Sequence, residues 1–572
     1  MKKIYFTLAL LLSALYSCSG FLDQDNRSNV PSEDFYKTTT GFASLTNSAY
    51  STLRELYNTQ PQLFVAGTDL YADGKSQGVV MGQYTFTADE SNIKNFYVNC
   101  FKGIQLANSV IHYGDITEDS SVRLQYVDEA RFLRAWYYFQ LVQQFGPVAL
   151  NKEMFDYAVM SHARTSLSDI YDFLISEFTY LGSSESNLLE RSNSGVGRAN
   201  KRAAAFYLAK VYLTRGWLDG QDYESQEANI AQSTDFANAA KYALEAINNE
   251  TPSVSLASAF DVENEENSEI FWSIQFSAAS VEDPVADGSY QQAQFGSYLG
   301  GSEKPLNKAI DGNFAPSLRL QQLYTHGDAR LEQTFMLEFH QNYFDYYNAP
   351  TTSPIIYYYA PAWATDADIA AWKADDPYGL KQNTLVSKTI ATGGIAPSNG
   401  AAATYKDRRS QDYGTACIKK FDDYSEASIS NRSTTCSMHD VVVSRLGEAY
   451  LIAAEAYIKQ SKPGEAANMI NSLRQRPGTV RSGYTTPMTV SASDMSIDFI
   501  LDERAREMAG EYVRWTDLKR THKLVQYVTQ YNEDGVKESA MIGTDGKYKT
   551  LRPIPQAAID LNQADVEQNP GY

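Results

Sequence analysis

Residues 444–478 read SRLGEAYLIAAEAYIKQSKPGEAANMINSLRQRPG, and apolar and small residues recur in them at helical spacing. Ala454 and Tyr457 stand on a first helical segment. A second segment carries Ala466, Ile470 and Leu473, and Pro477 follows it closely. Small residues at these offsets let two antiparallel helices approach closely, as in tetratricopeptide units. The stretch therefore predicts a hairpin of two packed helices.

A second part of the chain repeats this spacing. Ala209 and Tyr212 lie in NKRAAAFYLAKVYLTRGWL, and after an inserted loop they are followed by Ala239, Ala243 and Ala246. The match of these spacings to the tetratricopeptide pattern is degenerate. Generic packing of alanine-rich helices explains the spacings as well as tetratricopeptide-like pairing does. Both interpretations remain open at this point, but each predicts a helix pair.

Helical periodicity dominates both ends of the chain. It begins at Gly41, and further helices are indicated at 97–114, 122–146, 166–181, 235–249 and 496–520. Asn200 can cap one helix, and Gly146 with Pro147 can end another. Between about 252 and 440 the signal fades into runs rich in Gly, Pro, Asn and aromatic residues. There SEIFWSIQFS alternates like a strand, with Trp272 assigned to the core.

Composition limits the possible partners. The 572 residues include 49 basic and 69 acidic side chains, which give a net charge of −20. No basic run concentrates positive potential, so nucleic acid and anionic membrane surfaces are disfavoured as partners. Forty tyrosines supply flat apolar area with a polar tip, which suits wet recognition surfaces as well as cores.

The N-terminus has the features of a bacterial lipoprotein signal. MKKIYFTLALLLSALYSC combines two lysines with an apolar run too short to span a membrane, and it ends in LYSC. Residues 1–17 are therefore predicted to be a signal peptide, with Cys18 as the acylated residue and 18–40 as a lipid-anchored tether. Two or more acyl chains would hold the protein stably on a membrane. An ordinary secretory signal with an accidental cysteine is the alternative.

No motif indicates catalysis or a cofactor. Beyond Cys18 the chain has an odd number of cysteines and no CxxC pair, which excludes a zinc ribbon or a disulfide framework. A single Cys417–Cys436 bridge is possible, and the alternative is that residues 100, 417 and 436 are buried free thiols. The histidines lack metal-ligand spacing, and GxSxG, P-loop and HExxH motifs are absent. We therefore expect no enzyme activity, no metal and no cofactor.

Several long motifs resemble one family in the right order. The C-terminus LRPIPQAAIDLNQADVEQNPGY and the segments LDERAREMAGEYVRWTDLKRTHKL, SRLGEAYLIAAEAY and DEARFLRAWYYFQLVQQFGPVAL are similar to those of the SusD/RagB family of outer-membrane nutrient-binding lipoproteins. The similarity runs from Cys18 to Tyr572.

The resemblance implies a mainly α fold, in which a tetratricopeptide-like superhelical scaffold carries a loop-rich, minor-β insertion with the ligand face. It divides the chain into a helical region, 41–251, and a region 252–572 with an insertion at about 280–440. It also implies a surface lipoprotein that caps a SusC-like TonB-dependent transporter and captures glycan or peptide without catalysis. Within the family motifs, Arg504, Glu507 and Trp515 are expected to fix helix packing and ion pairing.

The ligand residues are expected among aromatic side chains of the insertion. Residues 341–363, QNYFDYYNAPTTSPIIYYYAPAW, contain six tyrosines, and prolines at 350, 354 and 361 argue against a packed helix or central strand. Sugars have apolar faces and polar rims, so flat aromatics with hydrogen-bonding neighbours can bind them. The candidates are Tyr71, Tyr97, Tyr298, Tyr343, Tyr346, Tyr359, Trp363 and Trp372.

Three of these candidates, Tyr343, Tyr359 and Trp363, are expected to point outward. Tyr97 is included because family members often carry an aromatic residue, commonly Trp, four positions before the helix that reads FKGIQLAN here. Two alternatives to glycan capture remain. A peptide-capturing member of the family could use the same tyrosines, and a glycan-cleaving enzyme would need paired carboxylates in a cleft.

Overall fold

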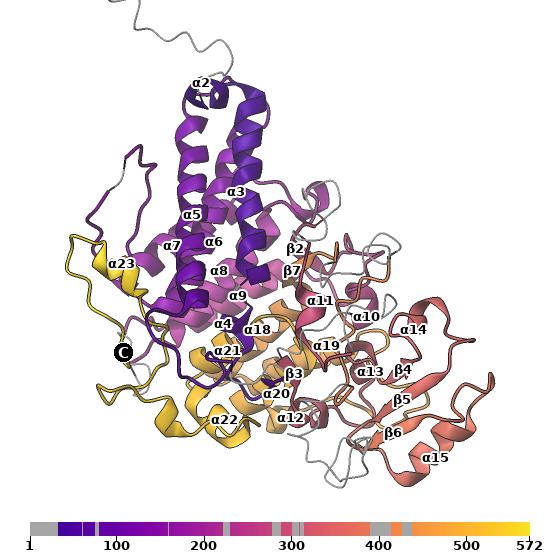
Figure 1. Ribbon diagram of the computed structural model, residues 1–572. Helices are drawn as coiled ribbons and strands as arrows, with labels where there is room; N and C mark the ends of the chain where they lie inside the picture. Colours follow the sequence, from indigo (N-terminus) through magenta and orange to yellow (C-terminus); the bar gives the residue numbers. More distant parts are fainter. Residues whose placement is uncertain are drawn as a thin grey trace, which may run out of the picture.

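The computed structural model describes residues 32–59, 61–74, 79–157, 159–220, 229–276, 288–299, 308, 314–388, 413–425 and 437–572. Figure 1 shows a helical scaffold and, at the lower right, a lobe of short strands and loops. The scaffold helices are α3 (Thr39–Thr59), α5 (Ser91–Gly114), α6 (Arg123–Phe145), α7 (Leu167–Gly182), α8 (Lys201–Gly216), α9 (Asp235–Ile247), α18 (Leu446–Lys459) and α19 (Pro463–Arg474). The prediction of a mainly α fold is confirmed.

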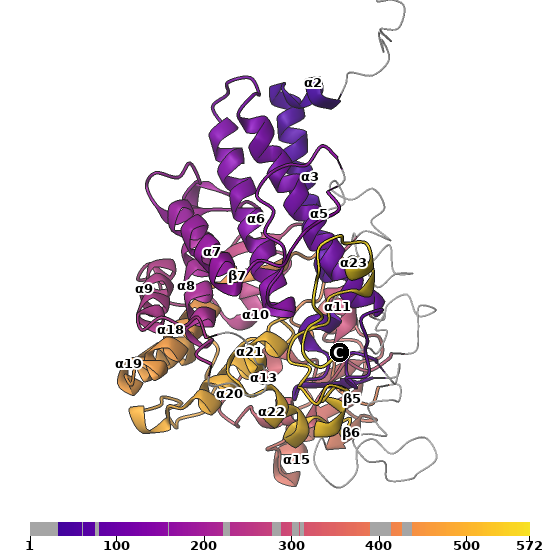
Figure 2. The ribbon, with the colours of Figure 1, turned by 90° about the vertical axis from the view of Figure 1, so that its left-hand side faces the viewer.

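The scaffold helices pack in the order α3, α5, α6, α7, α8, α9, α18 and α19. The step from α9 to α18 joins segments far apart in the sequence, and Figure 2 shows these two helices side by side, with α19 beyond α18. The residues between α9 and α18 are therefore inserted into one continuous helical stack.

Both predicted helix pairs are present. In the α8–α9 pair, Ala209 and Ala243 are fully buried, and the rings of Tyr212 and Tyr242 stack at 5.8 Å with an interplanar angle of 2°. In the α18–α19 pair the small and aliphatic positions singled out from the sequence are buried: Ala454, Ala466, Ile470 and Leu473. Small side chains at the contacts allow the helices to approach closely.

Local signals set several helix ends. Asn200 caps α8, because its side-chain oxygen accepts the Ala203 N–H at 3.0 Å. Gly146 has a φ of 66° and ends α6. Pro463 occupies the first position of α19, where its missing N–H costs nothing.

The aromatic core lies where the scaffold meets strand β2 (Ile270–Ile274). Trp272 of this strand is fully buried and packs edge-on against Trp136 of α6, with centroids 5.5 Å apart. The assignment of Trp272 to the core is confirmed. Cys100 and Cys417 are buried free thiols, whereas Cys436 lies outside the described residues.

The family-like segment of the second half forms a buried ionic network. Glu507 of α20 (Ile497–Glu507) accepts hydrogen bonds from Arg330 at 3.1 Å, Arg445 at 2.8 Å and Arg476 at 2.8 Å. Arg504 binds Asp517 at 2.6 Å and Glu448 at 2.9 Å. Trp515 is fully buried. These contacts confirm that Arg504, Glu507 and Trp515 fix helix packing and ion pairing.

The other α-helices of the described chain are short: α2 (Ser32–Tyr36), α4 (Gln62–Val65), α10 (Leu256–Ala259), α11 (Gln291–Gln294), α12 (Leu318–Gln322), α13 (Arg330–Thr334), α14 (Asp345–Asn348), α15 (Asp366–Ala374), α21 (Arg514–Arg520), α22 (Leu524–Tyr531) and α23 (Gln556–Asp560). Strand β1 (Tyr71–Asp73) pairs with β3 (Phe314–Pro316), and β2 pairs with β7 (Val441–Arg445), both antiparallel. A third sheet orders β4 (Glu338–His340), β5 (Ile355–Ala360) and β6 (Leu385–Lys388).

One expectation for the aromatic stretch is wrong. Strand β5 lies between β4 and β6 as the central strand of its sheet, although the prolines argued against this. Pro354 and Pro361 flank the strand and do not interrupt it, so no ladder N–H is lost inside it.

The helical part begins earlier than expected. Helix α2 starts at Ser32 and α3 at Thr39, so the last part of the predicted tether, 32–40, is largely helical. The predicted signal peptide and Cys18 lie outside the described residues. Among the helices of the described chain, none combines the length and apolar character of a membrane span.

Candidate functional site

The three consecutive tyrosines of β5 alternate between its faces. Tyr357 and Tyr359 lie on one face, with ring centroids 6.4 Å apart. Tyr358 lies on the other face and stacks on Trp372 of α15 at 3.9 Å, with an interplanar angle of 5°. This alternation follows from the two-residue period of an extended strand, and it confirms that the three rings cannot all face the same way.

A second aromatic stack follows the end of β5. The Trp363 ring stacks on His326 at 4.1 Å, and the guanidinium carbon of Arg481 lies 4.7 Å from its centre. Tyr484 packs against His326 at 5.7 Å. The His326 side chain is exposed, whereas Trp363, Arg481 and Tyr484 are half-buried. We call the two stacks together the tryptophan cluster: Tyr358, Trp372, Trp363, His326 and Tyr484.

The Tyr358–Trp372 stack has charged neighbours. Trp372 Nε1 donates a hydrogen bond to Oε1 of Glu338 at 2.5 Å, and Lys381 Nζ lies 4.5 Å from the ring centre. Burial raises the pKa of Tyr358, and the charge of Glu338 raises it further. The phenol therefore stays protonated at neutral pH and retains a donor.

The Trp363 stack is held by an ion pair. Arg481 Nε donates to the His326 carbonyl oxygen at 2.6 Å, and its Nη1 pairs with Glu332. Burial raises the pKa of Glu332. Trp363 Nε1, Glu332 Oε2 and Arg481 Nη2 are buried atoms without a hydrogen-bond partner among the described residues. Buried polar atoms normally have partners, but these three atoms are enclosed and do not face a ligand.

Of the residues predicted for the ligand face, the structure brings only Trp363 and Trp372 into this cluster. Tyr343 and Tyr359 were expected to point outward, and this is wrong, since their exposed fractions are 0% and 3%. Lys308 Nζ lies 5.1 Å from the Tyr343 ring centre, and the Tyr359 hydroxyl donates to the Tyr413 carbonyl at 2.9 Å. Both rings fill the interior of the lobe, where their apolar area is best used.

Tyr71 is also buried, with 3% of its surface exposed, so its predicted place on the ligand face is wrong. Its hydroxyl accepts the Gly510 N–H at 2.7 Å, which joins β1 to the segment after α20. Tyr97 is half-buried on α5 and packs on Phe101 at 4.9 Å within the scaffold.

Tyr298 and Tyr346 are half-buried and lie elsewhere in the lobe. The Tyr298 carbonyl accepts the Tyr413 N–H at 2.9 Å. Lys419 Nζ donates to the Tyr346 hydroxyl at 2.6 Å. Whether these two rings, or Tyr97, contact a ligand remains a prediction.

Sequence reasoning missed three members of the cluster, His326, Tyr358 and Tyr484. Strand alternation could have selected Tyr358, because it fixes which tyrosine faces away from its two neighbours. Nothing in the sequence brings His326 and Tyr484 together, since they meet only through tertiary packing. Over the described ranges, no three His, Cys, Asp or Glu side chains gather as a metal site.

Comparisons with known proteins agree with this architecture. A model described as SusD family matches residues 214–572, and one described as starch-binding associating with outer membrane matches 20–213. SusD-like protein P2 of Formosa agariphila is 24% identical over the full length of both chains. The starch-binding protein SusD of Bacteroides thetaiotaomicron is 25% identical, over 78% of this chain and 72% of its own.

A solved structure extends the likeness to the fold. Surface glycan-binding protein A from Bacteroides fluxus superposes with a TM-score of 0.64 at 17% identity, covering 93% of this chain and 99% of its own. The family's tetratricopeptide-like helical architecture is the one described above. The model described as SusD family alone matches more than half of the length of this chain, and the chain therefore belongs to the SusD family.

Proposed function

We propose that this protein is a cell-surface glycan-binding lipoprotein that captures oligo- or polysaccharide at the tryptophan cluster. The observation that carries the proposal is the pair of aromatic stacks, whose mostly half-buried rings are bordered by Glu338, Lys381 and Arg481. Flat rings suit the apolar faces of sugars, and polar atoms at their edges suit the hydroxyl groups. The names of two relatives, a starch-binding and a surface glycan-binding protein, support a glycan ligand.

The proposed role includes a membrane anchor and a partner. Acylated Cys18 would hold the protein on the outer membrane, facing the cell exterior, and a SusC-like TonB-dependent transporter would receive the captured glycan. The description of the matching N-terminal family model supports the outer-membrane association. No catalysis is proposed, and no cofactor, metal or nucleic acid is required for this role.

The expected affinity is modest. A few aromatic stacks at roughly 1 kcal/mol each, with hydrogen bonds, give dissociation constants in about the micromolar to millimolar range. Weak capture is sufficient when the transporter lies beneath, because the second contact is then made at high local concentration.

Calorimetry and affinity gels with starch, laminarin and xyloglucan test the proposal. Trp372→Ala and Trp363→Ala should each weaken binding of the recognised glycan by about five- to tenfold, because each removes a stack of about 1 kcal/mol together with its edge contacts. Tyr157→Ala is the matched control, since this ring is 76% exposed and lies outside the lobe. It should leave the affinity unchanged.

Two results would replace the proposal. Binding of oligopeptides without binding of any glycan would favour the peptide-capturing alternative. Release of reducing sugar by the purified protein would instead indicate a glycan-cleaving enzyme.

A further inference from the structure

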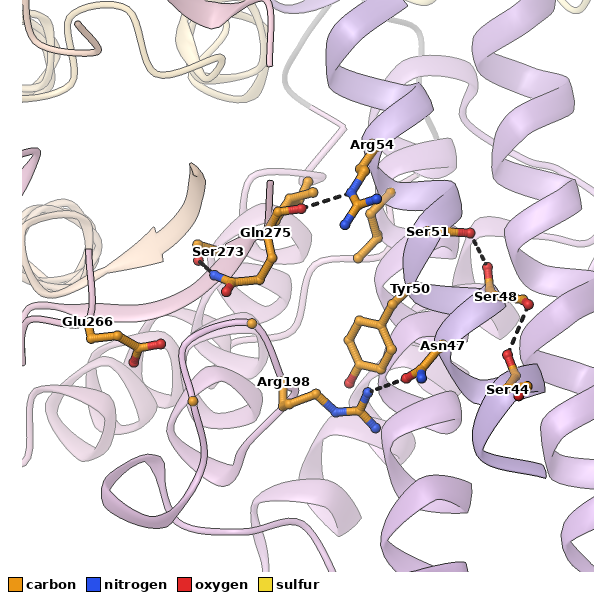
Figure 3. Close-up of a pocket in the computed structure, with 14 residues that line it drawn as sticks. Ser44, Asn47, Ser48, Tyr50, Ser51, Arg54, Arg198, Glu266, Ser273 and Gln275 are labelled. Atoms are coloured by element: carbon orange, nitrogen blue, oxygen red, sulfur yellow. Dashed lines mark hydrogen bonds between the residues drawn. The ribbon is translucent and has the colours of Figure 1, made fainter. Parts of the chain in front are cut away.

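A groove on the scaffold lies apart from the residues of the tryptophan cluster. It has a volume of about 640 Å³, within the range of about 300–1,000 Å³ typical of ligand pockets. Figure 3 shows its walls: helix α3, the glycine-containing loop before α8, and the end of β2. Gly197 in that loop has no room for a side chain, because an added Cβ would lie 2.3 Å from Gln275 Cγ.

The α3 wall presents small polar side chains. Ser44, Ser48 and Ser51 each donate their hydroxyl hydrogen to a carbonyl of the preceding helical turn, at 2.8–3.0 Å. The hydroxyl oxygens therefore keep acceptor lone pairs. Because these side chains are short, a ligand can lie close to the helix along this wall.

The groove also holds fixed groups that have no partner within the described residues. Asn47 Oδ1 accepts from Arg198 Nη1 at 3.1 Å, which orients the amide and leaves its nitrogen without a partner. Across the groove, Gln275 donates through Nε2 to Ser273 at 2.9 Å and to Asp440, and its Oε1 has no partner. An amide donor and an amide acceptor thus remain available on opposite walls.

The charges of the groove are balanced, because the two lining arginines, Arg54 and Arg198, are matched by lining Glu266 and by buried Glu129. Arg198 pairs with buried Glu129, and its guanidinium carbon lies 4.3 Å from the Tyr50 ring centre. Glu266 accepts the Val196 N–H at 3.2 Å. A polyanion or a polycation would gain no net attraction here, whereas a neutral ligand rich in hydroxyl groups could use both donors and acceptors.

We propose that this groove is a second saccharide-binding site, which takes a short neutral segment of a glycan chain. The half-buried Tyr50 ring, Leu53 and Ile274 supply the apolar part of the lining, and the amides and serine oxygens supply the hydrogen bonds. The inference deepens the proposed glycan capture and rests on it. Two weak sites on one molecule would raise the effective affinity for a long chain more than for a short one.

The test combines variants of both sites. Asn47→Ala removes the amide donor, and Ser48→Gln fills the groove from an exposed helical position. Asn95→Ala is the matched control, an exposed asparagine on α5. The probes are starch, laminarin and xyloglucan in affinity gels, with maltotriose, laminaritriose and xylogluco-oligosaccharide in calorimetry.

Asn47→Ala should weaken retention of the recognised polysaccharide by about fivefold, the effect of one lost hydrogen bond. Ser48→Gln should weaken it at least as much, because its longer side chain occupies the groove, and Asn95→Ala should have no effect. The loss should persist in a Trp363→Ala/Trp372→Ala background, where the groove is the remaining site. Thermal unfolding of all variants confirms that they are folded.

The outcomes separate the two proposals. If the groove variants bind like Asn95→Ala while the tryptophan variants lose affinity, the second site is rejected and the proposed function stands. If only the groove variants lose affinity, the groove is the saccharide site and the tryptophan cluster is not. If no probe glycan binds the unaltered protein, both proposals fail.

Discussion

At the scale of single residues, buried charge explains why the second half holds together. Glu507 is buried among Arg330, Arg445 and Arg476. Burial alone would raise the pKa of its carboxyl group, but the three guanidinium groups outweigh burial and hold the pKa well below its usual range. The carboxylate is therefore the common counter-ion of three arginines from separate segments of the chain.

Removing this carboxylate leaves three buried cations without their shared partner. We expect Glu507→Ala to reduce the free energy of unfolding by about 3–5 kcal/mol, as for other broken buried ion pairs. Urea unfolding at pH 7 measures the change. Glu118→Ala, at an exposed carboxylate, is the control and should stay within about 0.5 kcal/mol of the unaltered protein. Equal stability of the two variants would contradict the structural role of Glu507.

His439 makes a protonation-dependent contact next to Asp440, whose carboxylate accepts a hydrogen bond from Gln275 of the groove. Its Nδ1 lies 2.9 Å from the Asp440 carbonyl oxygen, and its Nε2 lies 2.8 Å from the Phe260 carbonyl oxygen. Carbonyl oxygens only accept, and a neutral imidazole can donate from only one nitrogen, so satisfying both requires the imidazolium. Burial lowers the pKa of His439, but the nearby Glu265 and the two carbonyls outweigh burial and raise the pKa above its ordinary value near 6.5.

This contact should make stability depend on pH. Because the pKa is higher in the folded state, the stabilisation is fully present below about pH 6.5 and is lost as the pH rises through the folded-state value. Denaturant unfolding of the unaltered protein and of His439→Gln should therefore differ more at pH 5.5 than at pH 8.5. Burial also raises the pKa of Glu265 and of Asp440, the latter to about 7. Both carboxyl groups are present in the unaltered protein and in His439→Gln, so their own titration contributes to both unfolding curves. A constant difference between the two curves would refute the charged state of His439.

At the scale of elements, close approach of α8 and α9 depends on alanine. Ala243 is fully buried between the two helices, whereas Ala237 on the same helix is exposed. We expect Ala243→Leu to destabilise the protein by about 1–3 kcal/mol through overpacking, and Ala237→Leu to change stability by less than about 0.5 kcal/mol. Thermal unfolding of the two variants measures the difference. An Ala243→Leu variant as stable as Ala237→Leu would show that the helix pair tolerates a wider spacing.

The same elements show what the sequence can predict. Helix pairs and the Trp272 strand follow from periodicity and capping, because each depends on residues close in the chain. The continuity of α9 with α18 and the meeting of His326 with Tyr484 depend on segments separated by long stretches, and no local pattern encodes them. Tyr343 and Tyr359 were misplaced because composition marks a segment as aromatic without saying which rings fill the interior.

At the scale of the whole molecule, the insertion between α9 and α18 separates two roles. The scaffold packs as one stack without the inserted lobe interrupting it, so the lobe can carry the proposed tryptophan cluster on loops and short strands. Binding residues are commonly placed in this way on loops held by a rigid framework. The proposed groove uses the scaffold itself, which would place a second contact on the more rigid part.

The proposed anchor belongs to this scale, because it determines where both sites work. Two or more acyl chains on Cys18, each stabilised by about 0.8 kcal/mol per buried methylene, would keep the protein on the outer membrane. We expect Cys18→Ala to move the protein from the outer-membrane fraction to the soluble fraction, with its glycan affinity unchanged, because that residue precedes the described fold. Ser19→Ala is the adjacent control and should remain membrane-bound. Immunoblots of fractionated cells measure both, and a membrane-bound Cys18→Ala protein would show that something other than the lipid holds it there.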